Sequence, residues 1–164
     1  MRILSFDPGF GRTGWGALER SGTRFAVLDY GLIETSNGMS HGERLQEIYN
    51  QVEHMIGQLE PDLVAMEKLI FGKSRSTAAG VFQAQGVILA AAGKHRLEVL
   101  ELGPKQIKLA LTGSGNADKK SVEMMVRRIL GIQTEIRPDD TADALAIGIA
   151  GAMQQQWNQV QLQN

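Results

Sequence analysis

The sequence predicts an α/β fold in which a mixed five-stranded sheet, starting with three antiparallel strands, carries helices on both faces. Three observations predict it. Three strand-like segments follow one another within the first 35 residues, strands and helices then alternate, and a length of 164 residues without an internal repeat suits one domain. We expect this domain to cover residues 1–157, followed by a polar tail at 158–164.

The first three strands are predicted by apolar runs separated by short turns. Residues 2–7 (RILSFD) end at a Pro-Gly turn, and residues 13–20 (TGWGALER) end at a Ser-Gly turn. Residues 24–35 (RFAVLDYGLIET) form the third run. The connections are too short for a crossover, so these strands should pair as an antiparallel meander.

A helix is predicted at residues 41–60, because apolar residues there recur at steps of three and four. Ser40, with Glu43 three residues later, matches a capping box, and Pro61 should end the helix. Segment 68–76 breaks the pattern, and segment 114–117 (SGNA) is expected to be a flexible linker. The remaining predicted elements are strands 62–67 and 97–102 and helices 77–95, 104–113, 118–130 and 138–157.

Composition excludes several kinds of chemistry. The chain has no cysteine, so disulfides, thiolate zinc sites and cysteine nucleophiles are excluded. The N-terminus (MRILSFDPG) does not resemble a signal peptide, and no apolar run approaches the ~20 residues of a membrane span. We therefore expect a soluble cytoplasmic protein.

Charge is distributed unevenly along the chain. Residues 1–66 hold 5 Lys/Arg and 9 Asp/Glu, a balance of −4, whereas residues 68–128 hold 11 Lys/Arg and 4 Asp/Glu, a balance of +7. A basic middle indicates a surface for a polyanion, although solvated helix faces explain it equally well. The candidates for phosphate contacts are Lys68, Lys73, Arg75, Lys105, Lys108, Lys119, Lys120, Arg127 and Arg128, of which the last two fit a plain surface role as well.

Acidic residues stand at the ends of two predicted strands. Asp7 closes the first strand and Glu67 closes the fourth, and ligands of α/β sheets gather at strand ends. Near the start of the last helix lie Asp139, Asp140 and Asp143, of which the last two share a helix face. Each acid alone has an ordinary structural explanation in a turn or a first helical turn. Together they predict a carboxylate cluster.

Such a cluster would repel itself unless it shared a cation. Mg²⁺ prefers oxygen ligands, and two ions about 3.5–4 Å apart would stabilise both the attacking and the leaving oxygen of a phosphodiester. We expect the glycines that follow Asp7 to let a substrate approach the turn closely. His41, His54 and His95 do not cluster in the sequence, and we expect none of them to bind metal.

Four segments resemble the RuvC family of bacterial crossover-junction endonucleases: FDPGFGRTGWG, PDLVAMEKLIF, GPKQIKLALTGSGNADKKSV and DDTADALAIGIA. The similarity runs in order from about residue 2 to about residue 154. It implies a ribonuclease-H-like fold and a homodimer that resolves four-way (Holliday) DNA junctions by two symmetric nicks. It also implies Mg²⁺ or Mn²⁺ as cofactor, with two ions per site, and the RuvA–RuvB branch-migration complex as a partner.

The resemblance assigns roles to individual residues. Asp7, Glu67, Asp140 and Asp143 match the family's metal-binding catalytic acids, and Asp139 stays outside this set. The basic residues near the scissile phosphate are matched by Lys108 and Lys119, of which Lys108 is a candidate for catalysis. An aromatic residue after the second acid stacks on junction bases in the family. Phe71 is the nearest aromatic here, and Ile70 is the alternative.

Other interpretations remain open at this point. A related nuclease acting on RNA or on another branched substrate fits the same residues. An actin-like kinase would need a much longer chain with two lobes. A non-catalytic DNA-binding module would gain nothing from four acids that repel phosphate. Helix 77–95 is rich in small residues, with Gly80 and Gly86 permitting close packing, and either packs internally or forms a dimer face.

Overall fold

The computed structural model describes residues 1–69 and 75–161, with the backbone alone at 75–77. The described residues form one five-stranded sheet. Its strands are β1 (Arg2–Asp7), β2 (Arg12–Ser21), β3 (Arg24–Glu34), β4 (Leu63–Glu67) and β5 (Glu98–Leu102). The order is β3-β2-β1-β4-β5, in which the first three strands pair antiparallel and β4 and β5 add in parallel to β1. The predicted fold class is confirmed.

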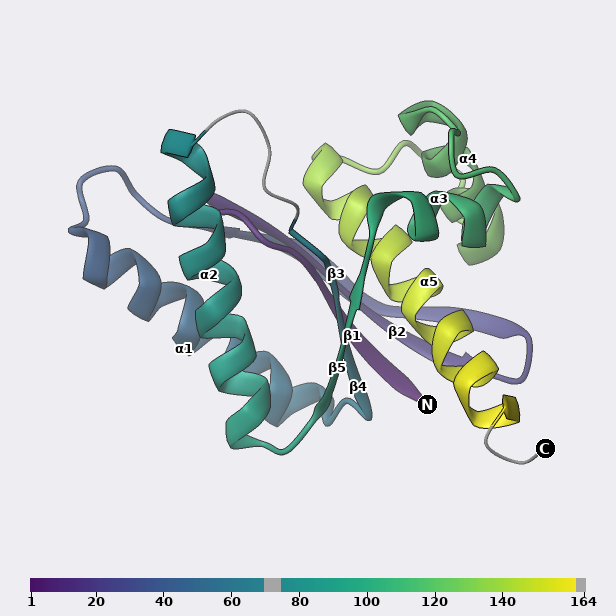
Figure 1. The fold of residues 1–164 in the computed structure, drawn as a ribbon, viewed down its shortest axis with the longest axis horizontal. Helices are drawn as coiled ribbons and strands as arrows, with labels where there is room; N and C mark the ends of the chain where they lie inside the picture. Colours follow the sequence, from purple (N-terminus) through teal and green to yellow (C-terminus); the bar gives the residue numbers. More distant parts are fainter. Residues whose placement is uncertain (70–74, 162–164) are drawn as a thin grey trace.

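Helices cover both faces of the sheet (Figure 1). One face carries α1 (His41–Leu59) and α2 (Arg75–Lys94), and the other carries α3 (Pro104–Thr112), α4 (Lys119–Leu130) and α5 (Asp139–Gln161). Helix α5 lies across β2, β1 and β4. None of the described helices has the length and hydropathy needed to cross a membrane.

Two hydrophobic cores sit on opposite faces because successive side chains of a strand alternate in direction. Ile3 of β1 packs under α5 against a cluster that includes Leu145. Its neighbour Leu4, with Phe6, points to the other face and packs in a cluster with Ile48 of α1. All of these side chains are almost completely buried. The central strand β1 is therefore covered on both sides, which holds its C-terminal end in place.

The predicted N-terminus of α1 is confirmed in detail. The Ser40 hydroxyl accepts a hydrogen bond from the Glu43 backbone N–H at 3.4 Å, and the Glu43 carboxylate accepts one from the Ser40 N–H at 2.7 Å. The helix ends at Leu59, followed by Glu60 in the left-handed region with φ of 45°. Pro61 follows directly, as the sequence predicted.

Two segments have local structure that the sequence did not predict. Residues 158–161, expected to belong to a polar tail, continue α5, and the Gln154 side chain donates to Asn158 one turn later at 2.9 Å. Segment 114–117, expected to be a flexible linker, forms a turn in which the Ala117 N–H donates to the Ser114 carbonyl at 3.2 Å, and Asp118 then caps α4 by accepting from the Ser121 N–H at 2.7 Å.

Candidate active site

Asp7 and Glu67 end neighbouring parallel strands. The register pairs Phe6 of β1 with Met66 of β4, so the two acids that follow these residues lie side by side at the same edge of the sheet. Helix α5 begins at this edge with Asp140 in its first turn and Asp143 three residues later. Three elements therefore bring four carboxylates to one place.

Glycine lets α5 approach the sheet closely at this edge. A Cβ on Gly14 of β2 would lie 2.0 Å from the backbone oxygen of Asp140, and a Cβ on Gly148 would lie 2.7 Å from the Ser5 hydroxyl. The expectation that glycines after Asp7 make room for substrate is therefore wrong for Gly14, because the helix fills that space. Ser5 also donates to the Ala144 carbonyl at 2.7 Å, which ties α5 to β1.

The turn after Asp7 is held from several sides. The Phe10 ring lies 4.0 Å from the Arg44 guanidinium and stacks on His41 at 4.4 Å between centroids. Gly80 of α2 makes room for this ring, since a Cβ there would lie 2.9 Å from the Phe10 Cβ. Thr13 donates to the Gly9 carbonyl at 2.7 Å. The position of Asp7 is thus fixed by the strand and by the turn that follows it.

The cluster carries strong electrostatic strain. The pKa of Asp7 is raised from 3.8 to about 7, first by burial and then by repulsion from Asp143, Glu67 and Asp140, while Lys119 opposes the rise. The pKa of Glu67 is also raised, first by burial and then by Asp143. Carboxylates this close favour either a shared proton or a bound cation.

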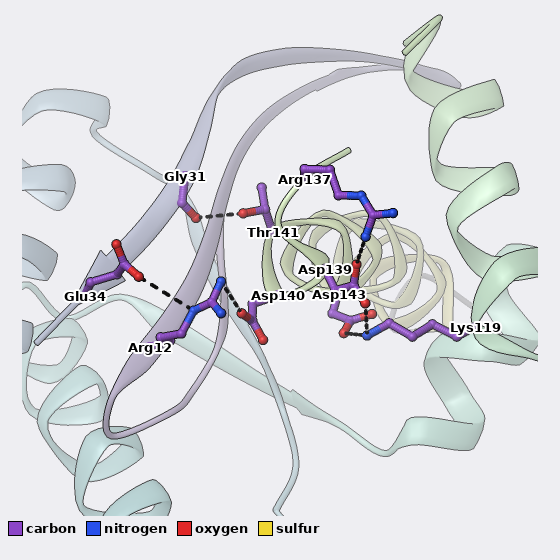
Figure 2. Close-up of polar contacts among 9 residues, drawn as sticks. All are labelled: Arg12, Gly31, Glu34, Lys119, Arg137, Asp139, Asp140, Thr141 and Asp143. Atoms are coloured by element: carbon purple, nitrogen blue, oxygen red, sulfur yellow. Dashed lines mark hydrogen bonds and ion pairs between the residues drawn. The ribbon is translucent and has the colours of Figure 1, made fainter. Parts of the chain in front are cut away.

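Two cations already neutralise part of the cluster (Figure 2). Lys119 at the start of α4 places its Nζ 2.9 Å from Asp143 Oδ2 and 3.4 Å from Asp139 Oδ2. The hydrogen bond to Asp143 raises the pKa of Lys119. On the other side, an Arg12 guanidinium nitrogen lies 3.2 Å from Asp140 Oδ2.

The residues fit a divalent metal ion by their chemistry. Within the described ranges no three acidic or histidine side chains are already arranged to hold a metal, since Lys119 and Arg12 engage two of the acids. Their donors are all carboxylate oxygens, the ligands that hard divalent cations prefer. Burial, and then repulsion from the other three acids, raises the pKa of Asp7 although Lys119 opposes the rise, and a divalent cation would offset both causes.

A cavity of about 220 Å³ adjoins the acids. Its polar lining consists of Glu67, Lys108, Lys119 and Asp143. Lys108 of α3 lowers the pKa of Glu67, opposing burial and Asp143. The rest of the lining is apolar: Pro104, Ile107, Val122, Ala146 and Ile147.

The other predicted DNA contacts are placed unequally. Lys105 in the first turn of α3 and Lys120 in the first turn of α4 are exposed. Each directly follows a residue that lines the cavity, Pro104 and Lys119 respectively. The predictions for Phe71, Lys73 and the alternative Ile70 lie outside the described residues. For Arg75 only the helical backbone is described, so its predicted contact also lies outside the description.

Sequence reasoning missed Arg12 and gave Asp139 no role. Arg12 contacts one of the four acids, and Asp139 pairs with both Lys119 and Arg137. A signal for Arg12 was present, because it is the first basic residue after Asp7 and directly follows the glycine-rich turn. Its partner lies far along the chain, and only the packing of α5 on β2 brings the two together.

This fold and this set of acids together define a nuclease of the ribonuclease-H-like class. The order β3-β2-β1-β4-β5, with acids at the ends of β1 and β4 and on the helix that crosses the sheet, is the arrangement of that class. A family model described as "Crossover junction endodeoxyribonuclease RuvC" matches residues 3–151. The chain belongs to the RuvC family.

Relatives match over nearly the full chain. The crossover junction endodeoxyribonuclease RuvC of Chloroflexus aggregans is 45% identical over 152 residues, covering 93% of each chain, and that of Alkaliphilus metalliredigens is 41% identical over the same length and shares. A structure of Thermus thermophilus RuvC in complex with a Holliday junction substrate superposes with a TM-score of 0.92. It is 33% identical and covers 96% of each chain.

Proposed function

We propose that this chain is an endonuclease that resolves four-way DNA junctions by hydrolysing one phosphodiester bond in each of two strands. The observation that carries the proposal is the convergence of Asp7, Glu67, Asp140 and Asp143 at one edge of the sheet. Membership of the RuvC family supports DNA as the substrate. The T. thermophilus relative, which shares this fold over 96% of the chain, binds a Holliday junction.

A nuclease of this family depends on a divalent metal ion, and we assign Mg²⁺ to the four acids, with two ions per site and Mn²⁺ able to replace it. The metal would supply Lewis-acid stabilisation of the phosphate and a more acidic water. Asp7 and Glu67, on strand ends, provide fixed ligands. Asp140 and Asp143 would complete the set of metal-holding residues, in competition with their present partners Arg12 and Lys119.

Basic side chains of this chain act on the phosphate directly. Lys108 lines the cavity beside Glu67 and would neutralise charge that develops on the non-bridging oxygens. Lys119 would exchange Asp143 for a phosphate oxygen. We propose that flanking phosphates are contacted by Lys73, Arg75, Lys105 and Lys120. Phe71 would stack on an exposed junction base.

A four-way junction with two-fold symmetry calls for two active sites, so we propose a homodimer. Helix α2 offers a suitable face. A Cβ added to Gly86 or Gly93 would meet nothing within 4 Å, and Leu89 between them is 37% exposed. Mutation of Leu89 to Glu should convert the dimer to a monomer in light scattering. As a family member acting on chromosomal DNA, the dimer would work in the cytoplasm with RuvA–RuvB.

The test compares substrates with and without Mg²⁺. A labelled four-way junction, the same sequences as a linear duplex, and an RNA–DNA hybrid are incubated with the protein. We expect paired nicks at symmetric positions of the junction and no cutting in EDTA. Faster cutting of the hybrid than of the junction would contradict the assigned substrate.

A further inference from the structure

A second hollow adjoins the acids. An open groove of about 630 Å³ lies at the N-terminus of α5, and its lining includes three cationic side chains. These are Lys119, which also lines the cavity with Lys108, and two arginines that no sequence argument selected, Arg12 and Arg137. The acids therefore have basic side chains on both sides.

Among the described residues, both arginines pair with carboxylates that are at least partly exposed. Arg12 pairs with Asp140 at 3.2 Å and with Glu34 at 3.8 Å, and its side chain is 50% exposed. Arg137 pairs with Glu135 at 2.8 Å and with Asp139 at 3.0 Å, and its side chain is 65% exposed. Exposed ion pairs contribute little to stability, so these guanidinium groups can change partners at low cost.

A guanidinium group binds phosphate as well as carboxylate, through two parallel hydrogen bonds. Arg12 already lies against Asp140, one of the four acids, so it stands within a side chain's reach of the scissile phosphate. It is the first residue of β2, two positions before Gly14, where α5 packs tightly, so its backbone position is fixed. Without Arg12 this side of the site would present mainly Asp140 and Glu34 to a polyanion.

We propose that Arg12 and Arg137 bind the backbone of the cleaved DNA strand in the groove at the N-terminus of α5, exchanging their carboxylate partners for phosphates. This inference rests on the proposed function. Lys119 lines both this groove and the cavity that holds Lys108, so the strand would pass the acids along cations that line the two neighbouring hollows. If Arg12 only positioned Asp140, replacing Arg12 would have no further effect on affinity once Asp140 is also replaced.

Junction binding without metal is the first test. Fluorescence anisotropy of a labelled four-way junction is measured in EDTA over a range of salt concentrations. Arg12→Gln should weaken binding roughly three- to tenfold and reduce the salt slope by about one, as expected for one lost phosphate contact. Arg12→Lys should keep the slope. Arg137→Gln should reproduce both losses.

Arg2→Gln is the matched control. Arg2 is also a half-exposed arginine of this sheet, 45% exposed and 3.6 Å from Glu19, but it lies at the end of β1 opposite Asp7. Its removal changes the net charge of the protein equally. We expect affinity and salt slope to stay at wild-type values. Equal losses in the Arg2 and Arg12 variants would overturn the inference.

Measurements in the Asp140→Asn background distinguish a direct contact of Arg12 with phosphate from an effect of Arg12 on the position of Asp140. If Arg12 acts only through Asp140, its removal changes nothing further in that background, and this result would overturn the inference. If Arg12 binds phosphate, Arg12→Gln still lowers affinity there, by at least as much as in wild type, since the Asp140 carboxylate no longer competes for Arg12. If the wild-type chain neither binds nor cuts junctions, the proposed function is overturned as well. If the wild-type chain binds junctions and Arg12→Gln leaves the affinity unchanged, this inference alone is overturned.

Discussion

Replacing Asp7 with Asn should stabilise the metal-free protein while abolishing strand cleavage. Its folded-state pKa of about 7 lies above the ordinary 3.8, so the folded state takes up a proton in this window and the unfolding free energy falls as pH rises from 4 to 7. A difference of about 3 pKa units corresponds to about 4 kcal/mol. Partial contact of Asp7 with water screens the repulsion, so we expect a gain of about 2 kcal/mol at pH 8.

Thermal unfolding in EDTA measures this gain. In a chain of this size 1 kcal/mol shifts the melting temperature by about 2–4 °C, so the variant should melt about 4–8 °C above wild type at pH 8. At pH 5, where Asp7 is already largely protonated in the folded state, the gain should be less than half as large. Adding Mg²⁺ should stabilise wild type more than the variant, because Asp7 is a proposed ligand.

Asp29→Asn is the control, because Asp29 is an exposed carboxylate of β3 that accepts from the Tyr30 N–H at 2.8 Å, away from the cluster. It should give no gain that depends on pH. The reasoning is refuted if Asp7→Asn melts at or below wild type at pH 8 in EDTA. It is equally refuted if the gain is the same at pH 5 and pH 8, since repulsion among ionised acids would then not be its cause.

Three further predictions concern cleavage and packing. The variants Glu67→Gln, Asp140→Asn and Asp143→Asn should each abolish cutting in Mg²⁺ but leave junction binding intact in gel shifts. If two of them cut at the wild-type rate, the active site lies elsewhere. Lys108→Ala should slow single-turnover cleavage more than it weakens binding, and lost affinity with a full rate would contradict its catalytic role. Gly14→Ala should cost about 2 kcal/mol or more in urea unfolding, because a Cβ would lie 2.0 Å from the Asp140 oxygen, and an unchanged midpoint would contradict that close contact.

Elements with strong local signals were predicted closely from the sequence. Helix α1 has a capping box at Ser40 and a proline after its last turn, and its bounds agree within one residue. Strands β1 and β4 end at Asp7 and Glu67 as predicted, because apolar runs and turn residues define them locally. The C-terminus of α5 has no such signal. Glutamine is a good helix former, so the glutamine-rich sequence does not mark an end of the helix after residue 157.

Features that depend on tertiary packing were not predictable in this way. The space opposite Gly14 is filled by α5, so a glycine that suggested room for substrate in fact makes room for a helix. The pairing of Arg12 with Asp140 arises only from that same approach. The turn at Ser114 is ordered by hydrogen bonds between residues that, in sequence, are typical of a flexible linker. In each case the residue type could be read from the sequence, but the residue that it contacts could not.

The ion pairs around the acids link metal binding to DNA binding. Arg12 and Lys119 are the partners of Asp140 and Asp143, so a metal that binds both carboxylates would compete with both cations. Freed cations at this edge favour a phosphate backbone, and a phosphate backbone that draws the cations away leaves the carboxylates open to metal. Such coupling is reciprocal, so each ligand must tighten the other by the same factor. The metal-free chain thereby keeps its repelling acids partly neutralised with the same side chains that would hold the substrate.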